Sequence, residues 1–430
     1  MTQAQAKYDA IVVGSGPGGA TVANELTRKN KKVLILEWGS NAPVKGSVVQ
    51  VALNAGIPGK SLLVTDMKGL SMIRGVCTGG SSVFYCATAF DPPYDMMKSY
   101  GIDLQEHVEA IKKEVPVQPL RDDLIGPGAK LMMDSARDLG YDWQKLNKFI
   151  YQDKCRAECE KCSYGCPYGA KWTARNYVED AVTNGCELVN GAKVKKIIYE
   201  NNTAVGVEYT KNFKTHSVFA DKIILSAGGV GTPIILRQNG IYEAGYEFFF
   251  DPLVMVFGQV EGLKSSGETQ MAAGIHMKEE GYLMVDLNFP TPIFLAQIAP
   301  KLKLHKAFSQ SKTLMLMVKI KDGLGGRLTW GGGVRKTLLS SDKDKLQDGY
   351  NRAKKILENA GAKSVYRGWT VAAHPGGTAK INHVVDSNLK TKKENLYVCD
   401  CSVIPEAWGL PPTLTLLALG KRLATHLTAS

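Results

Sequence analysis

The chain has 430 residues, of which 44% are hydrophobic and 22% charged, and its formal net charge is +12. This composition is typical of folded globular proteins and excludes disordered, collagen-like and low-complexity classes. At roughly 150 residues per domain, the length predicts two or three domains. No apolar run reaches the roughly 18 residues that a membrane-spanning helix needs, and the N-terminal MTQAQAKYDA carries no charged-then-apolar leader. We therefore expect a soluble, cytoplasmic protein with no signal peptide and no membrane span.

The excess of basic residues is spread along the chain, as in RKNKK at 28–32, KLKLHK at 301–306 and KTKK at 390–393. A basic surface suits acidic partners such as nucleic acid, an anionic membrane, an anionic substrate or an acidic redox protein. Because no nucleic-acid-binding motif accompanies these residues, we expect no nucleic-acid partner. A solvated basic surface and a specific docking face both stay open.

The first forty residues have the order strand, glycine-rich loop, helix, strand. An apolar run at 8–13 leads into GSGPGG at 14–19, a helical stretch covers about 20–30, and a second strand at 33–36 ends at Glu37. Glycines in such a loop allow a tight turn, backbone approach to a pyrophosphate and close helix packing, and the acid after the second strand can bond a ribose. The pattern predicts a dinucleotide site, without separating FAD from NAD, at Gly14, Ser15, Gly16, Gly18, Gly19, Glu37 and Trp38.

The rest of the chain alternates between helical and strand patterns. Residues 40–70 are punctuated by Gly and Pro and are predicted to be loop. Helices are predicted at 104–114, 128–139, 169–182 and 342–360, and strands within 188–225 and 246–335; the last sixty residues return to strand, loop and helix. This order predicts an α/β fold, in which a Rossmann-like nucleotide domain built from discontinuous segments is interrupted by a β-rich (α+β) substrate domain.

A cysteine-rich loop lies between these regions. Four of the nine cysteines, Cys155, Cys159, Cys162 and Cys166, fall within twelve residues, and a proline follows the last. The last three and the proline match the spacing of the bacterial ferredoxin run C-x2-C-x2-C-x3-C-P, with Cys155 one residue out of register. We expect these thiolates to bind an iron–sulfur cluster, of the [4Fe–4S] form if all four are ligands. A zinc site and structural thiols or disulfides are the alternatives.

Several separated segments together resemble the glucose–methanol–choline (GMC) family of FAD-dependent oxidoreductases. RGVCTGGSS at 74–82 and AGGVGTPIILRQNGI at 227–241 resemble its two signatures. Further segments resemble the family in the same order, namely AVGVEYT at 204–210, HPGGTAKI at 374–381, NLYVCDCSVIP at 395–405 and LPPTLTLLALGKR at 410–422. The region 246–365 carries no such motif. The resemblance implies additional FAD contacts at Gly79, Gly80, Ser82, Val194, Asp400, Pro412 and Thr413.

The same resemblance divides the chain into domains. It implies an FAD-binding domain made of 1–100, 169–245 and 369–430, a helical segment with the cysteine loop at 101–168, and a substrate domain at 246–368. Some family dehydrogenases carry an iron–sulfur cluster at about the position of this cysteine loop.

Two residues depart from the family pattern, and one fits it. Phe84 stands where members with covalent flavin have histidine, so we expect non-covalent FAD. Pro411 stands where the family has a second polar active-site residue, and proline offers neither a side-chain donor nor a backbone N–H. His374 remains the predicted catalytic base, because imidazole can accept a hydroxyl proton near neutral pH.

These observations imply an enzyme, an FAD-dependent dehydrogenase that takes hydride from an alcohol-like carbon of a small molecule. A cluster beside FAD would split the electron pair, so the expected acceptor is a cytochrome, a ferredoxin or a quinone, with or without a partner subunit. Three alternatives stay open: a reductase running the reverse flow onto an unsaturated or carbonyl substrate, an oxygen-using oxidase, and an electron-transfer subunit.

Overall fold

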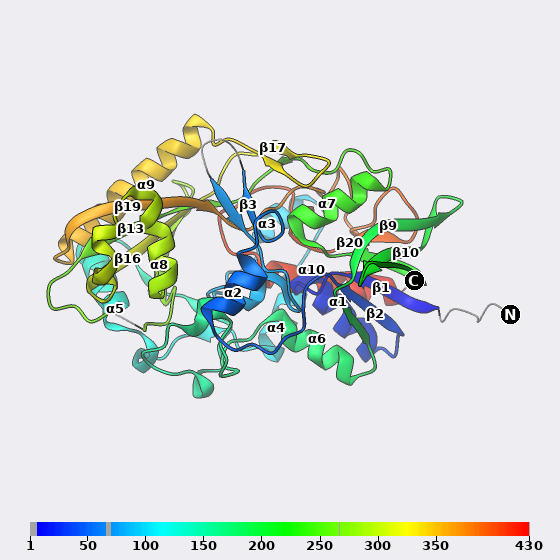
Figure 1. Cartoon of the computed structure of the whole chain (residues 1–430), viewed down its shortest axis with the longest axis horizontal. Helices are drawn as coiled ribbons and strands as arrows, with labels where there is room; N and C mark the ends of the chain where they lie inside the picture. Colours follow the sequence, from blue (N-terminus) through cyan, green and yellow to red (C-terminus); the bar gives the residue numbers. More distant parts are fainter. Residues whose placement is uncertain (1–6, 66–69, 266, 430) are drawn as a thin grey trace.

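Two large sheets lie at opposite ends of an elongated molecule (Figure 1). The computed structural model describes residues 7–65, 70–265 and 267–429. Most of the N-terminal segment on which the signal-peptide prediction depends, residues 1–6, lies outside the described residues. Within the described parts of the chain, no helix is both long and apolar enough to cross a bilayer.

The first sheet is assembled from segments far apart in the sequence. Its strands follow the order β8–β2–β1–β11–β10–β9, and β20 also pairs with β11. The β8, β2, β1, β11 and β20 neighbours are parallel, whereas β9, β10 and β11 form an antiparallel meander. The strands are β1 (Tyr8–Val13), β2 (Val33–Glu37), β8 (Glu187–Asn190), β9 (Lys193–Glu200), β10 (Thr203–Lys211), β11 (Lys214–Leu225) and β20 (Leu396–Val398). The predicted α/β fold with a discontinuous nucleotide-binding sheet is confirmed.

Helices from both ends of the chain pack beside this sheet. Helix α1 (Pro17–Arg28) contacts α6 (Ala174–Thr183) and α10 (Thr413–Ala429), and α10 also contacts α4 (Gln105–Glu114). Helix α1 begins before the predicted residue 20, because proline is well suited to a first helical turn, where no N–H partner is needed. Helix α7 (Gly228–Gln238) follows β11 directly.

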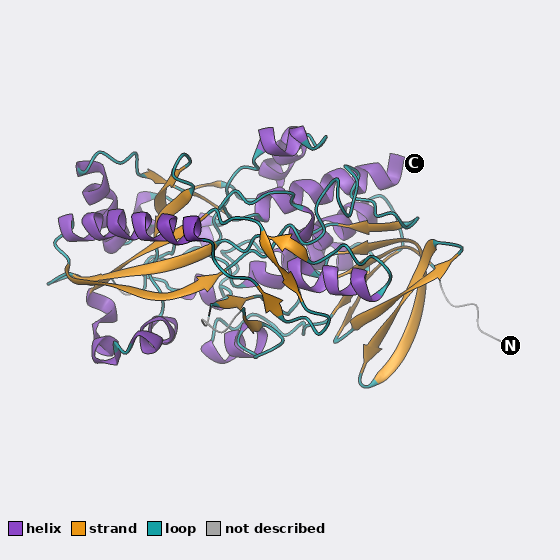
Figure 2. Ribbon diagram, turned by 90° about the horizontal axis from the view of Figure 1, so that it is seen from above, coloured by secondary structure: helices purple, strands orange, loops and turns teal. Residues whose placement is uncertain are grey.

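The second sheet has eight strands, five of which come from residues 252–372 and three from earlier in the chain. Its order is β3–β4–β19–β13–β16–β15–β14–β6, and α9 packs on β13, β16 and β19 (Figure 2). Its strands are β3 (Leu62–Val64), β4 (Ser71–Ile73), β6 (Gln144–Lys145), β13 (Pro252–Gln259), β14 (Ala273–Met277), β15 (Tyr282–Asp286), β16 (Thr313–Ile320) and β19 (Lys363–Ala372). Smaller ladders join β12 (Tyr246–Phe248), β17 (Gly325–Leu328) and β18 (Val334–Arg335), and β5 (Gln118–Pro119) with β7 (Asn147–Lys148). The domain boundaries given above remain predictions.

The remaining helices test the sequence patterns. The helices expected at 104–114, 128–139 and 342–360 are α4, α5 (Pro127–Asp138) and α9 (Ser340–Asn359). The loop prediction for 40–70 is wrong in part, because this region contains α2 (Val48–Ala55) and β3; residues 66–69 lie outside the described residues. The Ser47 side chain accepts a hydrogen bond from Gln50 N and so caps α2. The helices α3 (Tyr94–Ser99) and α8 (Thr291–Ile298) were not predicted.

Close packing between α1 and α10 gives a test of the fold. A Cβ added at Gly420 would lie 2.6 Å from Thr21 Cβ and 3.0 Å from Gly18 O. Because alanine would overpack this contact, we expect Gly420→Ala to lower the free energy of unfolding by about 1–3 kcal/mol, measured by urea denaturation. Gly331→Ala is the control, since its Cβ would meet nothing within 4 Å. Equal stabilities of the two variants would contradict the packing argument.

Candidate active site

The glycine-rich loop uses its glycines in two different ways. A Cβ at Gly14 would lie 2.3 Å from Ser226 O, one at Gly18 would lie 2.1 Å from Cys399 O, and one at Gly19 would lie 2.3 Å from Gly14 O. These three glycines therefore allow the loop to pack against the ends of β11 and β20. A Cβ at Gly16 would instead meet nothing within 4 Å. Open space at this position, beside the N–H groups that begin α1, fits a pyrophosphate.

Glu37 lies beneath this loop and is almost fully engaged by protein groups. Its Oε2 accepts hydrogen bonds from Ser15 N at 3.0 Å and Ser15 Oγ at 2.6 Å, and its Oε1 accepts one from Gly39 N at 2.6 Å. Burial raises the pKa of this carboxyl, and these hydrogen bonds oppose the rise. Glu37 thus fixes the loop, while the predicted ribose contact remains a prediction.

The second glycine loop lies directly against the first. Gly79 N donates to Ser15 Oγ at 3.1 Å, and a Cβ at Gly80 would lie 3.1 Å from Gly16 Cα. Ser82 Oγ donates to Gly79 O at 2.6 Å and accepts a hydrogen bond from Ala174 N, so it ties this loop to α6. Residues from two motifs more than sixty positions apart therefore border the open space at Gly16.

Three cations surround the ring of Trp38, which follows Glu37. Lys193 Nζ lies 4.4 Å, Lys60 Nζ 5.1 Å and the Arg74 guanidinium carbon 5.9 Å from a Trp38 ring centroid. Burial lowers the pKa of Arg74 to about 10. None of the three cations forms an ion pair with a carboxylate in the described part of the chain. An anionic dinucleotide fits this corner, because three nearby cations give it a positive potential.

The C-terminal motif residues hold neighbouring segments together. Asp400 Oδ2 accepts hydrogen bonds from Gly228 N at 2.8 Å and Thr232 Oγ1 at 2.5 Å, and Oδ1 accepts one from Ser402 N at 2.8 Å. Asp400 therefore caps the start of α7 rather than presenting a free carboxylate. Three further predicted FAD contacts are also buried. Val194 lies in β9, and Pro412 and Thr413 lie at the start of α10.

His374 lies in a turn that rests on the first turn of α7. Thr378 Oγ1 donates to Gly229 O at 2.8 Å, and a Cβ at Gly229 would lie 1.8 Å from Pro375 O. His374 itself has φ +52°, in the left-handed region that a bulky residue rarely adopts. The histidine turn and the cofactor loops thus contact the same end of β11 and α7.

Two charged residues that the sequence analysis missed contact His374. Asp251 Oδ2 lies 3.3 Å from His374 Nδ1, and Lys319 Nζ lies 3.2 Å from the same nitrogen. Burial and the Lys319 charge lower the pKa of His374, and Asp251 opposes this. The signal in the sequence was a single charge inside an apolar run, in FFFDPLV and in LMLMVKI.

The four loop cysteines are free thiols; Cys162 lies within a short 3-10 turn, Lys161–Tyr164, and the other three lie before or after it. Burial raises the pKa of Cys155 to about 11 and also raises the pKa values of Cys159 and Cys162. Among the described residues, no group of three or more His, Cys, Asp or Glu side chains is placed to hold a metal ion. The donor types suit a cluster, but the arrangement of the side chains does not fit one.

Two buried lysines adjoin this loop. Lys171 Nζ donates to Cys162 O at 2.6 Å, Val83 O at 2.7 Å and Tyr85 O at 2.9 Å. Lys148 Nζ donates to Cys86 O, Gln270 O, Met271 O and Thr88 Oγ1 at 2.5–3.0 Å. Neither lysine has a carboxylate ion pair among the residues that the structure describes. The two charges are held by neutral acceptors alone.

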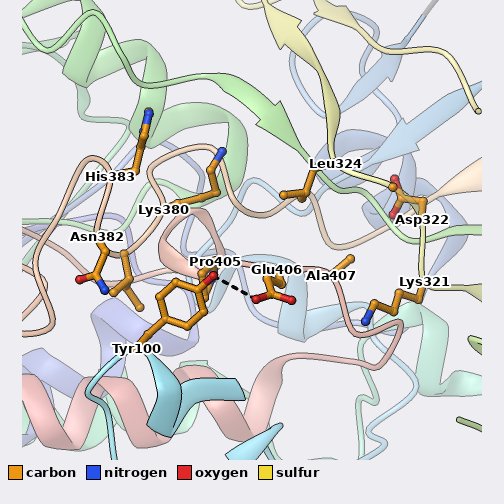
Figure 3. A pocket seen from close by; sticks show the side chains of 12 residues that line it. Tyr100, Lys321, Asp322, Leu324, Lys380, Asn382, His383, Pro405, Glu406 and Ala407 are labelled. Carbon is orange, nitrogen blue, oxygen red and sulfur yellow. Dashed lines mark hydrogen bonds between the residues drawn. The ribbon is translucent and has the colours of Figure 1, made fainter. Parts of the chain in front are cut away.

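A surface pocket of about 560 Å³ lies elsewhere, beside the segment that follows the histidine turn. Its lining includes Lys321, Lys380 and His383, and Tyr100 Oη donates to Glu406 Oε1 at 3.0 Å across it (Figure 3). His374 does not line it. We therefore place the candidate active site at His374 and the glycine loops, not in this pocket.

The fold and this corner define a dinucleotide-binding α/β protein. Residues 8–247 match the N-terminal domain and residues 333–420 the C-terminal domain of the GMC oxidoreductases. The chain belongs to the GMC oxidoreductase family, as its sequence motifs predict, and FAD as its cofactor is confirmed at the level of the family.

Similar proteins span nearly the whole chain. An uncharacterized protein of Methanocaldococcus jannaschii is 28% identical over 96% of this chain and 98% of its own length. A long-chain-alcohol oxidase of Arabidopsis thaliana is 22% identical over 99% of this chain and 68% of its own. Pyridoxine 4-oxidase from Mesorbium loti has a TM-score of 0.78 at 16% identity, covering 99% of this chain and 100% of that one. Formate oxidase has a TM-score of 0.75, also at 16% identity, with 99% of each chain covered.

The open space at Gly16 generates a prediction about cofactor content. A valine side chain would fill this space, so we expect purified Gly16→Val to lose most of its FAD, measured as flavin absorbance per mole of protein. Gly331→Val, far from the loops in sequence and without close neighbours, should keep its FAD. Full flavin content in Gly16→Val would contradict the assignment of the pyrophosphate to this loop.

Proposed function

We propose that this chain oxidises an alcohol group of a small molecule with His374 as the general base. The observation that carries the proposal is the position of His374, whose Nδ1 faces the Asp251 carboxylate while 28% of its side chain stays exposed. Nε2 is then the nitrogen left to receive the hydroxyl proton. When bound, FAD supplies the acceptor for the hydride, so the alcohol carbon becomes a carbonyl.

The other predicted site residues have binding and positioning roles in this proposal. The loops at 14–19 and 79–82 would hold the pyrophosphate, and Trp38 with its surrounding cations would lie at the adenosine end. The turn at 374–378 packs against Gly229, so the base is anchored to the end of the same sheet as the loops. Phe84 offers no nucleophile, which supports non-covalent attachment of the flavin.

The base assignment predicts the kinetics of a single substitution. We expect His374→Ala to retain FAD and to slow flavin reduction by an alcohol about 10²–10⁴-fold, the usual contribution of a positioned base. Anaerobic stopped-flow absorbance measures this rate, using the faster of a long-chain primary alcohol and pyridoxine, the compounds named in two similar enzymes. His276→Ala, on β14, is the matched control. Equal rates in the wild-type protein and His374→Ala would contradict the proposal.

A cluster-bearing dehydrogenase is the second candidate, favoured by the two buried lysines beside the cysteine loop. A buried cation without a counter-charge is costly, and an anionic iron–sulfur centre on four thiolates would provide that charge. Such a centre would pass electrons singly to a cytochrome, a ferredoxin or a quinone, whereas the similar enzymes named as oxidases support oxygen as the acceptor. The present arrangement of the side chains does not fit a cluster, so we derive no step through it.

Metal analysis decides between these candidates. If the loop binds [4Fe–4S], anaerobically purified protein should contain about four irons per chain. Cys162→Ser should then lose iron and keep FAD, because a serine oxygen is a poorer match for iron. Cys186→Ser, outside the loop, should keep both. Finding about one zinc or no metal in anaerobic protein would contradict the cluster and favour the oxidase.

A further inference from the structure

His374 forms a triangle of close contacts with two buried charged residues, Asp251 and Lys319. Lys319 Nζ lies 3.1 Å from Asp251 Oδ2 and 3.2 Å from His374 Nδ1, and Asp251 Oδ2 lies 3.3 Å from His374 Nδ1. The side chains of Lys319 and Asp251 are each 1% exposed. Lys319 belongs to β16, where it pairs with Leu253 of β13, so the pairing of these two strands brings it to the residue that precedes β13.

The backbone at two corners of this triangle is strained. Asp251 has φ +45° and His374 has φ +52°, both in the left-handed region. Strain of this kind persists only where neighbouring structure imposes it. Here the Asp322 carboxylate accepts hydrogen bonds from Phe250 N and Asp251 N, and Lys336 pairs with Asp322 at 2.7 Å. A second buried ion pair thus holds the backbone that presents Asp251.

Two neighbours compete for Nδ1 of His374, because Lys319 can only donate to it and the Asp251 carboxylate can only accept from it. We take Asp251 Oδ2 as the acceptor of both N–H groups, from Lys319 and from His374 Nδ1, because a hydrogen bond to a carboxylate is stronger than one to a neutral imidazole. A protonated Nδ1 leaves the Nε2 lone pair free. Asp251 Oδ1 is buried and has no partner among the described residues, so both contacts fall on Oδ2.

The charges around the imidazole come from several elements. Asp251 precedes β13, and Lys319 lies on β16. A third titratable residue, Cys401, follows β20, and its Sγ lies 3.8 Å from the backbone oxygen of His374. Asp322 faces Lys319 from beyond β16. Of these groups, Asp251 and Lys319 act directly on the imidazole ring, in opposite directions.

We propose that Asp251 and Lys319 are positioning residues for His374: Asp251 holds the Nδ1 proton, and Lys319 holds the Asp251 carboxylate in place. This inference rests on the proposed function of His374 as base and deepens it. Because Pro411 contributes no polar side chain, the proposed active site depends on His374 alone as the base, and Asp251 fixes its tautomer through Nδ1. Burial and the Lys319 charge both oppose protonation of the imidazole, whereas Asp251 favours it.

The tautomer can be measured without knowing the substrate. In FAD-loaded protein with ¹⁵N-labelled histidine, ring ¹⁵N shifts report which nitrogen is protonated, and His374→Ala identifies the signal among the seven histidines. We expect neutral His374 to carry its proton on Nδ1, the minor form of free histidine. A proton on Nε2 would overturn the proposal.

Substitutions then test each partner. In Lys319→Met the loss of a cation beside the ring favours the imidazolium, so the pKa of His374 should rise by about one unit. The rising limb of flavin reduction against pH should move upward equally, while Lys319→Arg should behave as wild type. Lys421→Met is the control, because it removes a lysine of α10 that is ion-paired to Glu25 of α1 and Glu114 of α4. An unchanged His374 pKa in Lys319→Met would overturn the role of Lys319.

Lys319→Met leaves the buried Asp251 charge unpaired and could therefore fail to fold, so a third variant is needed. Asp251→Leu/Lys319→Met removes both charges, and His374 should then shift towards the Nε2 proton; retention of the Nδ1 proton would overturn the role of Asp251. A different result tests the proposed function of His374 as the base. If flavin reduction is unchanged in His374→Ala although the tautomer is as expected, the base assignment is wrong and the triangle is only structural.

Discussion

The contact of the first glycine loop with the ends of two distant strands is the constraint on which the cofactor site depends. Gly18 packs against Cys399 O, and Gly14 and Gly19 pack against Ser226 at distances that no side chain would allow. Ser226 Oγ also donates to Cys399 O at 2.9 Å, which joins the two strand ends to each other. The second glycine loop then packs on the first through Ser15, and the histidine turn packs on Gly229, three residues after Ser226.

A second principle governs the substrate side, where charge is buried within a strand-rich core. Lys319, Asp251, Asp322 and Lys336 form two ion pairs with almost no solvent exposure. Such pairs add little net stability, because desolvation offsets most of their attraction, but removing one partner is severely destabilising. Their value lies in geometry: they fix a strained turn and a ring orientation that apolar packing alone would leave free.

The sequence predicted those parts of the molecule whose chemistry is encoded by local spacing. The glycine loop, α1 and β2 follow from one continuous pattern, and His374 follows from its motif. Asp251 and Lys319 are 68 positions apart and meet only through the pairing of β13 with β16, which no local pattern encodes. Helix α2 was missed because Gly and Pro punctuate residues 40–70, and its Val49 and Leu53, 68% and 62% exposed, do not form the buried face of an amphipathic helix.

The order in which the chain is made has a consequence for flavin uptake. Strand β1 and the glycine loop are synthesised first, yet β1 pairs with β11 about two hundred residues later, and α1 packs on α10, which begins at Thr413. The loop on a nascent chain therefore lacks the walls that shape it until these late segments emerge. Non-local contacts of this kind form slowly. Flavin capture should accordingly be a late event in biosynthesis, and the half-made nucleotide unit, with apolar surface uncovered, is the species that most needs protection by chaperones.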